Sequence, residues 1–359
     1  MEKAYIVLSD GQVFEGSRFG AQGDTVGELV FTTGMVGYTE TLTDPSYCGL
    51  IVIQTFPLIG NYGVMSADME SGGVAAKAYV VREWCENPSN FRAEMNIDAF
   101  LKSQGVIGIC GVDTRQLTRI IREHGVINAK IVSELTPDML EGVAEYRVNG
   151  AVERMSVEQM QVHPAQGEER FHVAMLDYGT KRSIVTELTK RGCRVSMLPY
   201  NTSAEAVLAL NADGLMLSSG PGDPRDNVAC IEQLKKLLGK LPIFGICLGH
   251  QLLALAAGGD TVKLKYGHRG ANQPVKQLST GKVYISTQSH GYAVVSDSLD
   301  AARAKESFVN ANDGTCEGIE YPRDNAFTVQ FHPEACAGPK DTGFLFDEFL
   351  KRMGDTQHA

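Results

Sequence analysis

The alternation of short apolar strands with amphipathic helices, which begins at Phe171, constrains the fold of this chain more than any other feature of its sequence. Glycines follow the expected helices: Gly192 follows the helix at 181–191, and Gly258 follows the helix at 248–257. This order predicts a doubly wound, mostly parallel α/β sheet with helices on both faces, and ligands in such a sheet bind beyond the carboxyl ends of the strands. We expect strands at 173–176, 194–198, 214–217, 243–246 and 327–331, and helices at 181–191, 204–210, 227–238 and 248–257.

The earlier part of the chain follows a different pattern, and 359 residues exceed what one hydrophobic core usually serves. Ser9-Asp10-Gly11 between two apolar stretches predicts a β-hairpin. One helix is expected from Asp113 as N-cap to Gly125 just past its end, and another from Thr136-Pro137. We therefore expect a mixed, β-rich N-terminal domain over 1–149, a polar connector over 150–170 and the α/β domain over 171–359, with further N-terminal strands at 28–31, 50–55 and 78–82.

Composition excludes several classes of protein. Asp and Glu number 43 against 33 Lys and Arg, a net charge of −10, so the chain is a poor candidate for binding nucleic acid or an anionic membrane. The apolar run at 4–8 is too short for a signal peptide, and no stretch has the pattern of a membrane span, which makes a cytoplasmic protein the expectation. The eight cysteines include no C-x-x-C pair, which argues against a disulfide framework and against a zinc site, so no metal is expected on this chain.

One cysteine stands in a context that favours reactivity. Gly245-Ile246-Cys247-Leu248-Gly249 lies where an apolar strand is expected to turn into a helix, the sharp corner that exposes a nucleophile at the edge of a sheet. The helix N-terminus favours a thiolate there, and the N–H of Leu248 is placed to hold an oxyanion. Gly108-Ile109-Cys110 repeats the tripeptide without the second glycine, so Cys110 is expected to be an ordinary buried cysteine.

A thiol nucleophile needs a base and a group that orients the base. The strand expected at 327–331 delivers His332-Pro333-Glu334 at its carboxyl end, the same edge of the sheet as Cys247. Glu334 can bind one imidazole nitrogen and leave the other for sulfur, which predicts a Cys247-His332-Glu334 triad. Other histidines are weaker candidates: we expect His250 to pack behind the nucleophile, His290 to line the substrate site and His268 to support a loop.

These motifs together resemble the class I glutamine amidotransferases, and several further segments resemble the small-subunit family of carbamoyl-phosphate synthases. The further segments are Ser218-Ser219-Gly220-Pro221-Gly222-Asp223-Pro224 and Tyr266-Gly267-His268-Arg269-Gly270-Ala271-Asn272 in the second half, and Thr33-Gly34-Met35-Val36-Gly37-Tyr38, Leu42-Thr43-Asp44-Pro45-Ser46-Tyr47, Ile59-Gly60-Asn61-Tyr62-Gly63 and Asp113-Thr114-Arg115-Gln116-Leu117-Thr118-Arg119 in the first.

The resemblance implies glutamine hydrolysis through a Cys247 thioester, with His332 moving the proton and Glu334 orienting His332. It also implies a heterodimer with a large subunit that receives the ammonia through a tunnel and makes carbamoyl phosphate from bicarbonate and ATP. ATP and Mg²⁺ would bind that partner, and this chain would carry no cofactor. The N-terminal domain would contact the partner and supply one wall of the glutamine site. The residues implied to hold glutamine, or the oxyanion formed from it, are Ser46, Gly220, Gly222, Leu248, Gln251, Ser289, Gly291 and Tyr292.

Ser289 and Tyr292 stand where the family usually has Asn and Phe, and Ser219 replaces an asparagine. The chain carries neither a G-x-x-x-x-G-K-[ST] loop nor a G-x-G-x-x-G after a strand, which fits an ATP-using step on another chain. Two alternatives remain. A stand-alone Cys-dependent γ-glutamyl hydrolase would have no use for the first domain, and a non-catalytic binding partner would have no use for an intact triad.

Overall fold

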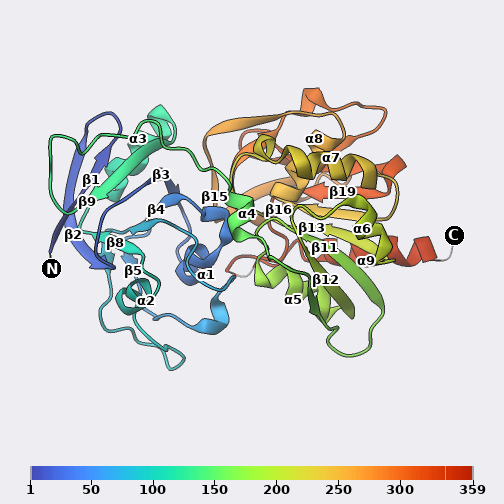
Figure 1. Ribbon diagram of the computed structural model, residues 1–359, viewed down its shortest axis with the longest axis horizontal. Helices are drawn as coiled ribbons and strands as arrows, with labels where there is room; N and C mark the ends of the chain where they lie inside the picture. Colours follow the sequence, from blue (N-terminus) through green and yellow to red (C-terminus); the bar gives the residue numbers. More distant parts are fainter. Residues whose placement is uncertain (1, 336, 358–359) are drawn as a thin grey trace. The chain divides into compact units, whose positions relative to one another are not determined.

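The computed structural model describes residues 2–335 and 337–357, which fall into two compact units, Met1–Asn149 and Gly150–Ala359. Each unit has its own sheet and its own hydrophobic core (Figure 1). The first unit is β-rich and mixed, and the second contains the predicted α/β alternation, so the fold class expected from the sequence is confirmed.

The first unit is built on a closed barrel in which the strands follow the order β1-β2-β8-β6-β4-β3-β9. The predicted hairpin joins β1 to β2, which pair antiparallel. β4 is buried along its whole length, as its continuous apolar sequence requires. The barrel strands are β1 (Lys3–Leu8), β2 (Val13–Gly20), β3 (Thr25–Thr32), β4 (Leu50–Gln54), β6 (Ala78–Val80), β8 (Ile107–Cys110) and β9 (Ile127–Val132), and the unit adds β5 (Leu58–Ile59), β7 (Glu83–Trp84), α1 (Tyr38–Thr43), α2 (Ile97–Ser103) and α3 (Thr114–His124).

One of the two helices predicted in this unit is confirmed and the other is wrong. The side chain of Asp113 accepts a hydrogen bond from the N–H of Gln116 and caps α3, and Gly125 follows its last residue. The segment that begins at Thr136-Pro137 forms successive turns with hydrogen bonds three residues apart and no α-helix. Gly142 there has φ of +72°, and the segment buries only Val143 completely, so no apolar face stabilises a helix.

The second unit is built on a ten-stranded sheet in the order β10-β12-β11-β13-β14-β19-β18-β17-β15-β16. The strands from β12 to β19 pair in parallel and form the predicted doubly wound core. Figure 1 shows this sheet with helices against it. The core consists of β11 (Phe171–Asp177), α5 (Arg182–Lys190), β12 (Cys193–Pro199), α6 (Ala204–Ala209), β13 (Gly214–Leu217), α7 (Val228–Leu237), β14 (Ile243–Ile246), α8 (Leu248–Ala256), β19 (Ala326–Val329) and α9 (Phe344–Gln357).

Two apolar clusters cover the two faces of this parallel core. Alternate residues of β11 point to opposite sides, so Leu176 packs with α6, α7 and α8 while Met175 packs with α5 and α9. Phe244 of β14 stacks on Phe327 of β19, with ring centroids 4.4 Å apart. Burial on both faces holds the carboxyl ends of β14 and β19 side by side.

Four strands beyond β19, which the sequence does not predict, extend the sheet in antiparallel fashion. The 150–170 segment, expected to be a connector, contains a short helix and a strand that pairs antiparallel with β12. These elements are β15 (Thr261–Gln277), β16 (Val283–Val294), β17 (Lys305–Asn310), β18 (Cys316–Tyr321), α4 (Ala151–Met155) and β10 (Gln161–His163).

Two expectations from composition concern the described residues. None of their helices combines the length and the apolarity that crossing a membrane would require. The seven described cysteines form no disulfide, and all except Cys85 are buried. Cys336 lies outside the described residues. The expectation that most cysteines are small buried side chains is therefore confirmed for this part of the chain.

Candidate active site

Cys247 sits at a strained corner between β14 and α8. Its φ of +53° and ψ of −103° place it in a region that non-glycine residues avoid, as the sharp corner of a nucleophile elbow requires. Its N–H donates to the carbonyl of Val329 at 2.9 Å, which ties the corner to the end of β19. The residue directly precedes the first turn of α8, where unpaired N–H groups and the helix dipole favour negative charge.

The two glycines of the elbow are required by close packing. A Cβ on Gly245 would come within 2.9 Å of Cγ2 of Thr328, and one on Gly249 within 2.5 Å of the carbonyl oxygen of Leu217. The backbone of α8 therefore passes directly against the end of β13, and the N–H of Gly249 donates to the carbonyl of Ser218 at 3.0 Å. This packing explains why the chain has glycine on both sides of Cys247.

His332 and Glu334 form a buried pair at the end of β19. Nδ1 of His332 lies 2.7 Å from Oε1 of Glu334, and both side chains are fully buried. The backbone N–H of His332 donates to the carbonyl of Thr287 at 2.9 Å, so β16 also holds the base in place. Nδ1 is thereby committed to the carboxylate, and Nε2 is left for a proton donor.

The second nitrogen of His332 is available for Cys247. Nε2 is buried and has no hydrogen bond of normal geometry to the residues that the structure describes. The Cys247 thiol nevertheless lies close enough to be among the groups that raise the pKa of His332. The predicted nucleophile, base and orienting carboxylate thus meet at the edge of the sheet formed by β14 and β19.

Lys181, the N-cap residue of α5, is a fourth member of this site that the sequence does not indicate. Its Nζ lies 2.8 Å from Oε1 of Glu334, and both side chains are almost completely buried. One carboxylate oxygen therefore accepts from both a lysine and a histidine. No local motif marks such a lysine, because its partner is distant in the sequence and reaches it only through the parallel sheet.

The charges in this group shift two pKa values in opposite directions. Burial and Lys181 act to lower the pKa of His332, but Glu334 and the thiol outweigh them, and the pKa lies well above its ordinary value. Burial acts to raise the pKa of Glu334, but Lys181 and His332 together hold it well below its ordinary value. Glu334 is therefore a carboxylate at neutral pH, and His332 is a stronger proton acceptor than a free imidazole.

A Glu334→Gln variant should lose stability in a pH-dependent manner. The pKa of His332 is raised by folding, so its contribution to stability is complete below pH 6.5 and declines above it. The pKa of Glu334 is lowered by folding, so its contribution to stability is complete above pH 4.5 and declines below it. The loss should thus be greatest between these values, about 3–5 kcal/mol for breaking a buried ion pair. Urea denaturation below, within and above this range checks it, with the exposed Glu168→Gln as control. A loss that is the same at all three would contradict it.

Three residues predicted to surround the oxyanion lie at the same edge. Leu248 is the first residue of α8, so its N–H has no acceptor within the helix. Gly220 packs directly on the backbone of Tyr178 and on Leu248, where a Cβ would come within 2.8 Å of Cδ2 of Leu248. Gly222 follows with φ of +90°, a conformation that favours glycine. Nearby, the Ser219 hydroxyl donates to the carbonyl of Gly179 at 3.4 Å.

The predicted glutamine-binding residues of the second unit meet at α8 and β16. Nε2 of Gln251 donates to the carbonyl of Tyr292 and to Oε1 of Gln330, both at 2.8 Å. The Ser289 hydroxyl is buried and has no hydrogen-bond partner among the described residues, which leaves it available to a ligand. Gly291 lies against Arg269: a Cβ added to Gly291 would be 3.0 Å from Nη2 of that guanidinium. Binding of glutamine by these residues stays a prediction.

Ser46 belongs to the first unit, in the short 3-10 helix Pro45–Tyr47. Its N–H donates to the carboxylate of Asp44 at 2.9 Å, while its hydroxyl is buried and unpaired within the described residues. The predicted role of Ser46 in holding glutamine also stays a prediction.

His250 has the structural role expected for it. It is fully buried on α8, its Nδ1 lies 2.8 Å from Oγ1 of Thr328, and burial lowers its pKa to about 3, so the ring is neutral. Cys110 is buried, its thiol donates to the carbonyl of Ser17 at 3.4 Å, and burial raises its pKa. It thus has the character of an ordinary buried cysteine.

Comparisons with known proteins assign both units of the chain to known families. Residues 174–352 match the family model of class I glutamine amidotransferases, so the second unit belongs to that class. Residues 6–131 match the carbamoyl-phosphate synthase small chain, CPSase domain. The carbamoyl phosphate synthase small chain of Bacillus caldolyticus is 47% identical to this chain, and the match covers 99% of this chain and 100% of the relative. The carbamoyl phosphate synthase small chain of Listeria monocytogenes serotype 4b is 48% identical, and the match covers 100% of this chain and 99% of the relative. The chain belongs to the carbamoyl-phosphate synthase small-chain family.

Proposed function

We propose that this chain is the glutamine-hydrolysing subunit of a carbamoyl-phosphate synthase, with Cys247, His332 and Glu334 as its catalytic triad. One observation carries the proposal: the strained elbow of Cys247 and the buried His332–Glu334 pair lie at the ends of two hydrogen-bonded parallel strands, β14 and β19. The match to the class I glutamine amidotransferases supports glutamine as the substrate.

In the first step Sγ of Cys247 attacks the side-chain carbonyl carbon of glutamine. The thiol proton passes to Nε2 of His332 before the attack, since the raised pKa of His332 favours the imidazolium. The new C–S bond then forms, and negative charge develops on the carbonyl oxygen. The N–H of Leu248 and an N–H of the 220–222 loop would bind that oxyanion. Glu334 stabilises the imidazolium through Nδ1 and does not take up the proton itself.

Collapse of this intermediate breaks the C–N bond, and the proton on His332 passes to the leaving nitrogen, which departs as ammonia. The thioester that remains is attacked by water, whose proton returns through His332 as the C–S bond breaks. Glutamate leaves and the thiol is restored, so one glutamine and one water give one glutamate and one ammonia.

The ammonia would pass through a tunnel to a large partner subunit, which combines it with bicarbonate and ATP. The names of the full-length relatives, each a small chain of carbamoyl phosphate synthase, support such a partner. The absence of a phosphate-binding loop motif from the sequence agrees with ATP and Mg²⁺ binding on the partner. The assembly would then be a heterodimer or a multiple of it.

Ammonia release from glutamine, measured with and without the partner chain, tests the proposal. We expect slow hydrolysis by this chain alone and an increase of about tenfold or more when the partner, bicarbonate and ATP are present, the size typical of coupling between two sites. A stand-alone γ-glutamyl hydrolase would be fully active by itself and would not respond to the partner. No hydrolysis under either condition would point to a non-catalytic protein.

A further inference from the structure

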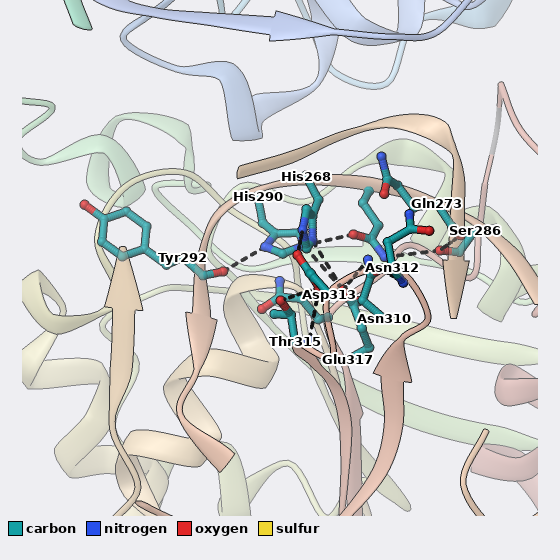
Figure 2. A network of polar contacts seen from close by, with 12 residues as sticks. His268, Gln273, Ser286, His290, Tyr292, Asn310, Asn312, Asp313, Thr315 and Glu317 are labelled. Carbon is teal, nitrogen blue, oxygen red and sulfur yellow. Dashed lines mark hydrogen bonds and ion pairs between the residues drawn. The ribbon is translucent and has the colours of Figure 1, made fainter. Parts of the chain in front are cut away.

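A second cluster of polar side chains includes a residue of β16, the strand that carries Ser289 and Tyr292. His268 of β15, His290 of β16 and Glu317 of β18 meet there, as Figure 2 shows. His290 and Glu317 are buried, and His268 is 9% exposed. All three come from the antiparallel part of the sheet, and none belongs to the triad. His290 is the histidine that the sequence predicts to line the substrate site.

Each imidazole is anchored through its outer nitrogen. Nε2 of His268 lies 2.8 Å from Oδ2 of Asp313, and the other carboxylate oxygen, Oδ1, accepts a hydrogen bond from the hydroxyl of Thr315 at 2.7 Å. Nδ1 of His290 lies 2.8 Å from the carbonyl oxygen of Tyr292. Hydrogen bonds of this kind, to a carboxylate or a backbone carbonyl, orient histidines that bind metal ions and place the free electron pair on the opposite nitrogen.

The inner atoms of the cluster converge on Oε1 of Glu317, which also accepts a hydrogen bond from Nδ2 of Asn310 at 3.4 Å. Nδ1 of His268 lies 3.5 Å from Oε1 of Glu317, and Nε2 of His290 lies 3.9 Å from the same oxygen. Nε2 of His290 is also 3.1 Å from Oε1 of Gln288. Nδ1 of His268 and Oε2 of Glu317 are buried without a hydrogen bond of normal geometry among the described residues. Such a site calls for a cation.

We propose that His268, His290 and Glu317 bind one divalent transition-metal ion, with Zn²⁺ the preferred occupant. Two imidazole nitrogens and a carboxylate are common ligands of Zn²⁺, and Oε1 of Gln288 is placed as a fourth, neutral donor. Ligands about 2.05 Å from a tetrahedral ion lie about 3.3 Å apart, and the ligand atoms of the three residues already lie within 4.8 Å of one another. Small side-chain movements would close the site.

The competing occupant is a proton. Protonated His268 would lie between the carboxylates of Asp313 and Glu317, and the cluster would be an ion pair that needs no metal. In that arrangement the two ring nitrogens of His290 each face an oxygen atom, one of Gln288 and one of Tyr292. A neutral imidazole carries one N–H, so it can donate to only one of the two. A metal ion satisfies the inner nitrogen of both rings at once, and the observations favour it.

A metal at this position would couple to the active site, if the proposed function holds. It would join β15, β16 and β18 at His290, which lies between Ser289 and Tyr292 in the sequence. Thr287, also on β16, is hydrogen-bonded to the backbone of His332. Loss of the ion should therefore raise KM for glutamine several-fold while kcat changes little, because none of the three ligands belongs to the triad.

Metal content tests the site without reference to activity. The full chain, purified without a histidine tag or chelator, should contain one equivalent of zinc by plasma mass spectrometry. The metal-free chain should bind Co²⁺ with the visible spectrum of a tetrahedral nitrogen and oxygen site. Glu317→Gln should lose the metal, and Asp313→Asn, which removes only the outer anchor of His268, should weaken zinc binding about 10- to 100-fold.

His172→Asn is the matched control, since His172 is also a buried histidine on a strand of this sheet but is paired with Ser196 at 2.8 Å, away from the cluster. It should keep the full metal content. Two results together would overturn the proposal and assign the cluster to a proton. The wild-type chain would contain much less than one equivalent of metal, and it would show no saturable binding of Co²⁺ or Zn²⁺ that Glu317→Gln removes. Glutamine hydrolysis by the triad does not require the metal, so the two proposals fail separately.

Discussion

Replacement of Cys247 with alanine should abolish glutamine hydrolysis, and replacement with serine should reduce kcat by a factor of about 10⁴ or more, as removal of a nucleophile does elsewhere. A serine hydroxyl has a far higher pKa than a thiol and would not be activated by an imidazole arranged for sulfur. The elbow should keep its shape in both variants, since Cys247 is 2% exposed and the backbone bonds that hold it involve no side-chain atom.

Cys110→Ser is the matched control for this experiment, because it changes the same Gly-Ile-Cys tripeptide in the first unit. Its serine can keep the hydrogen bond to the carbonyl of Ser17, so glutaminase activity should remain close to wild type. Labelled glutamine should leave an acid-stable thioester on wild type and none on Cys247→Ala. Hydrolysis by Cys247→Ala at the wild-type rate would refute the nucleophile assignment.

The part of the site that can be predicted from the sequence is the part that short motifs encode. The elbow needs two glycines, a strand before it and a helix after it, and all four signals fall within 243–257. His332 and Glu334 are predictable because a short apolar strand ends at them. Each prediction relies on residues close in the chain and on the rule that parallel strands share one carboxyl edge.

The residues that the sequence does not reveal depend on contacts distant in sequence. Lys181 has the local appearance of a surface residue at the start of a helix, and only the sheet brings it to Glu334. The His268 cluster spans three strands that are not predicted, because β15 carries Gly267, Gly270 and Pro274 and shows shifts in register against β16. Glycine, proline and bulges obscure a period of two.

Cysteine spacing argues against a zinc site, and that argument applies only to sites built from cysteine pairs. A set of two histidines and one glutamate on three strands leaves no fixed spacing to recognise. The helix expected at Thr136-Pro137 shows the converse failure. Its capping signal is local and correct in form, but the segment has too little apolar surface to be held as a helix.

Gly249→Ala and Gly354→Ala should shift the stability of the chain in opposite directions, although both replace a glycine within a helix of the second unit. In a helix without steric conflict, alanine stabilises by about 0.5–1 kcal/mol relative to glycine. A Cβ on Gly354 would lie 3.8 Å from Cζ of Phe171, an ordinary contact, so this variant should gain stability.

A Cβ on Gly249 would instead lie 2.5 Å from the carbonyl oxygen and 2.6 Å from Cβ of Leu217, and neither group can turn away because both belong to the end of β13. The helix α8 must move off the sheet, which should cost about 1–3 kcal/mol and outweigh the gain in helix propensity. That movement also displaces Cys247 from His332, so kcat should fall together with the unfolding temperature. Calorimetry and the ammonia assay on both variants check this, and a stabilised, fully active Gly249→Ala would show that the elbow does not depend on this close approach.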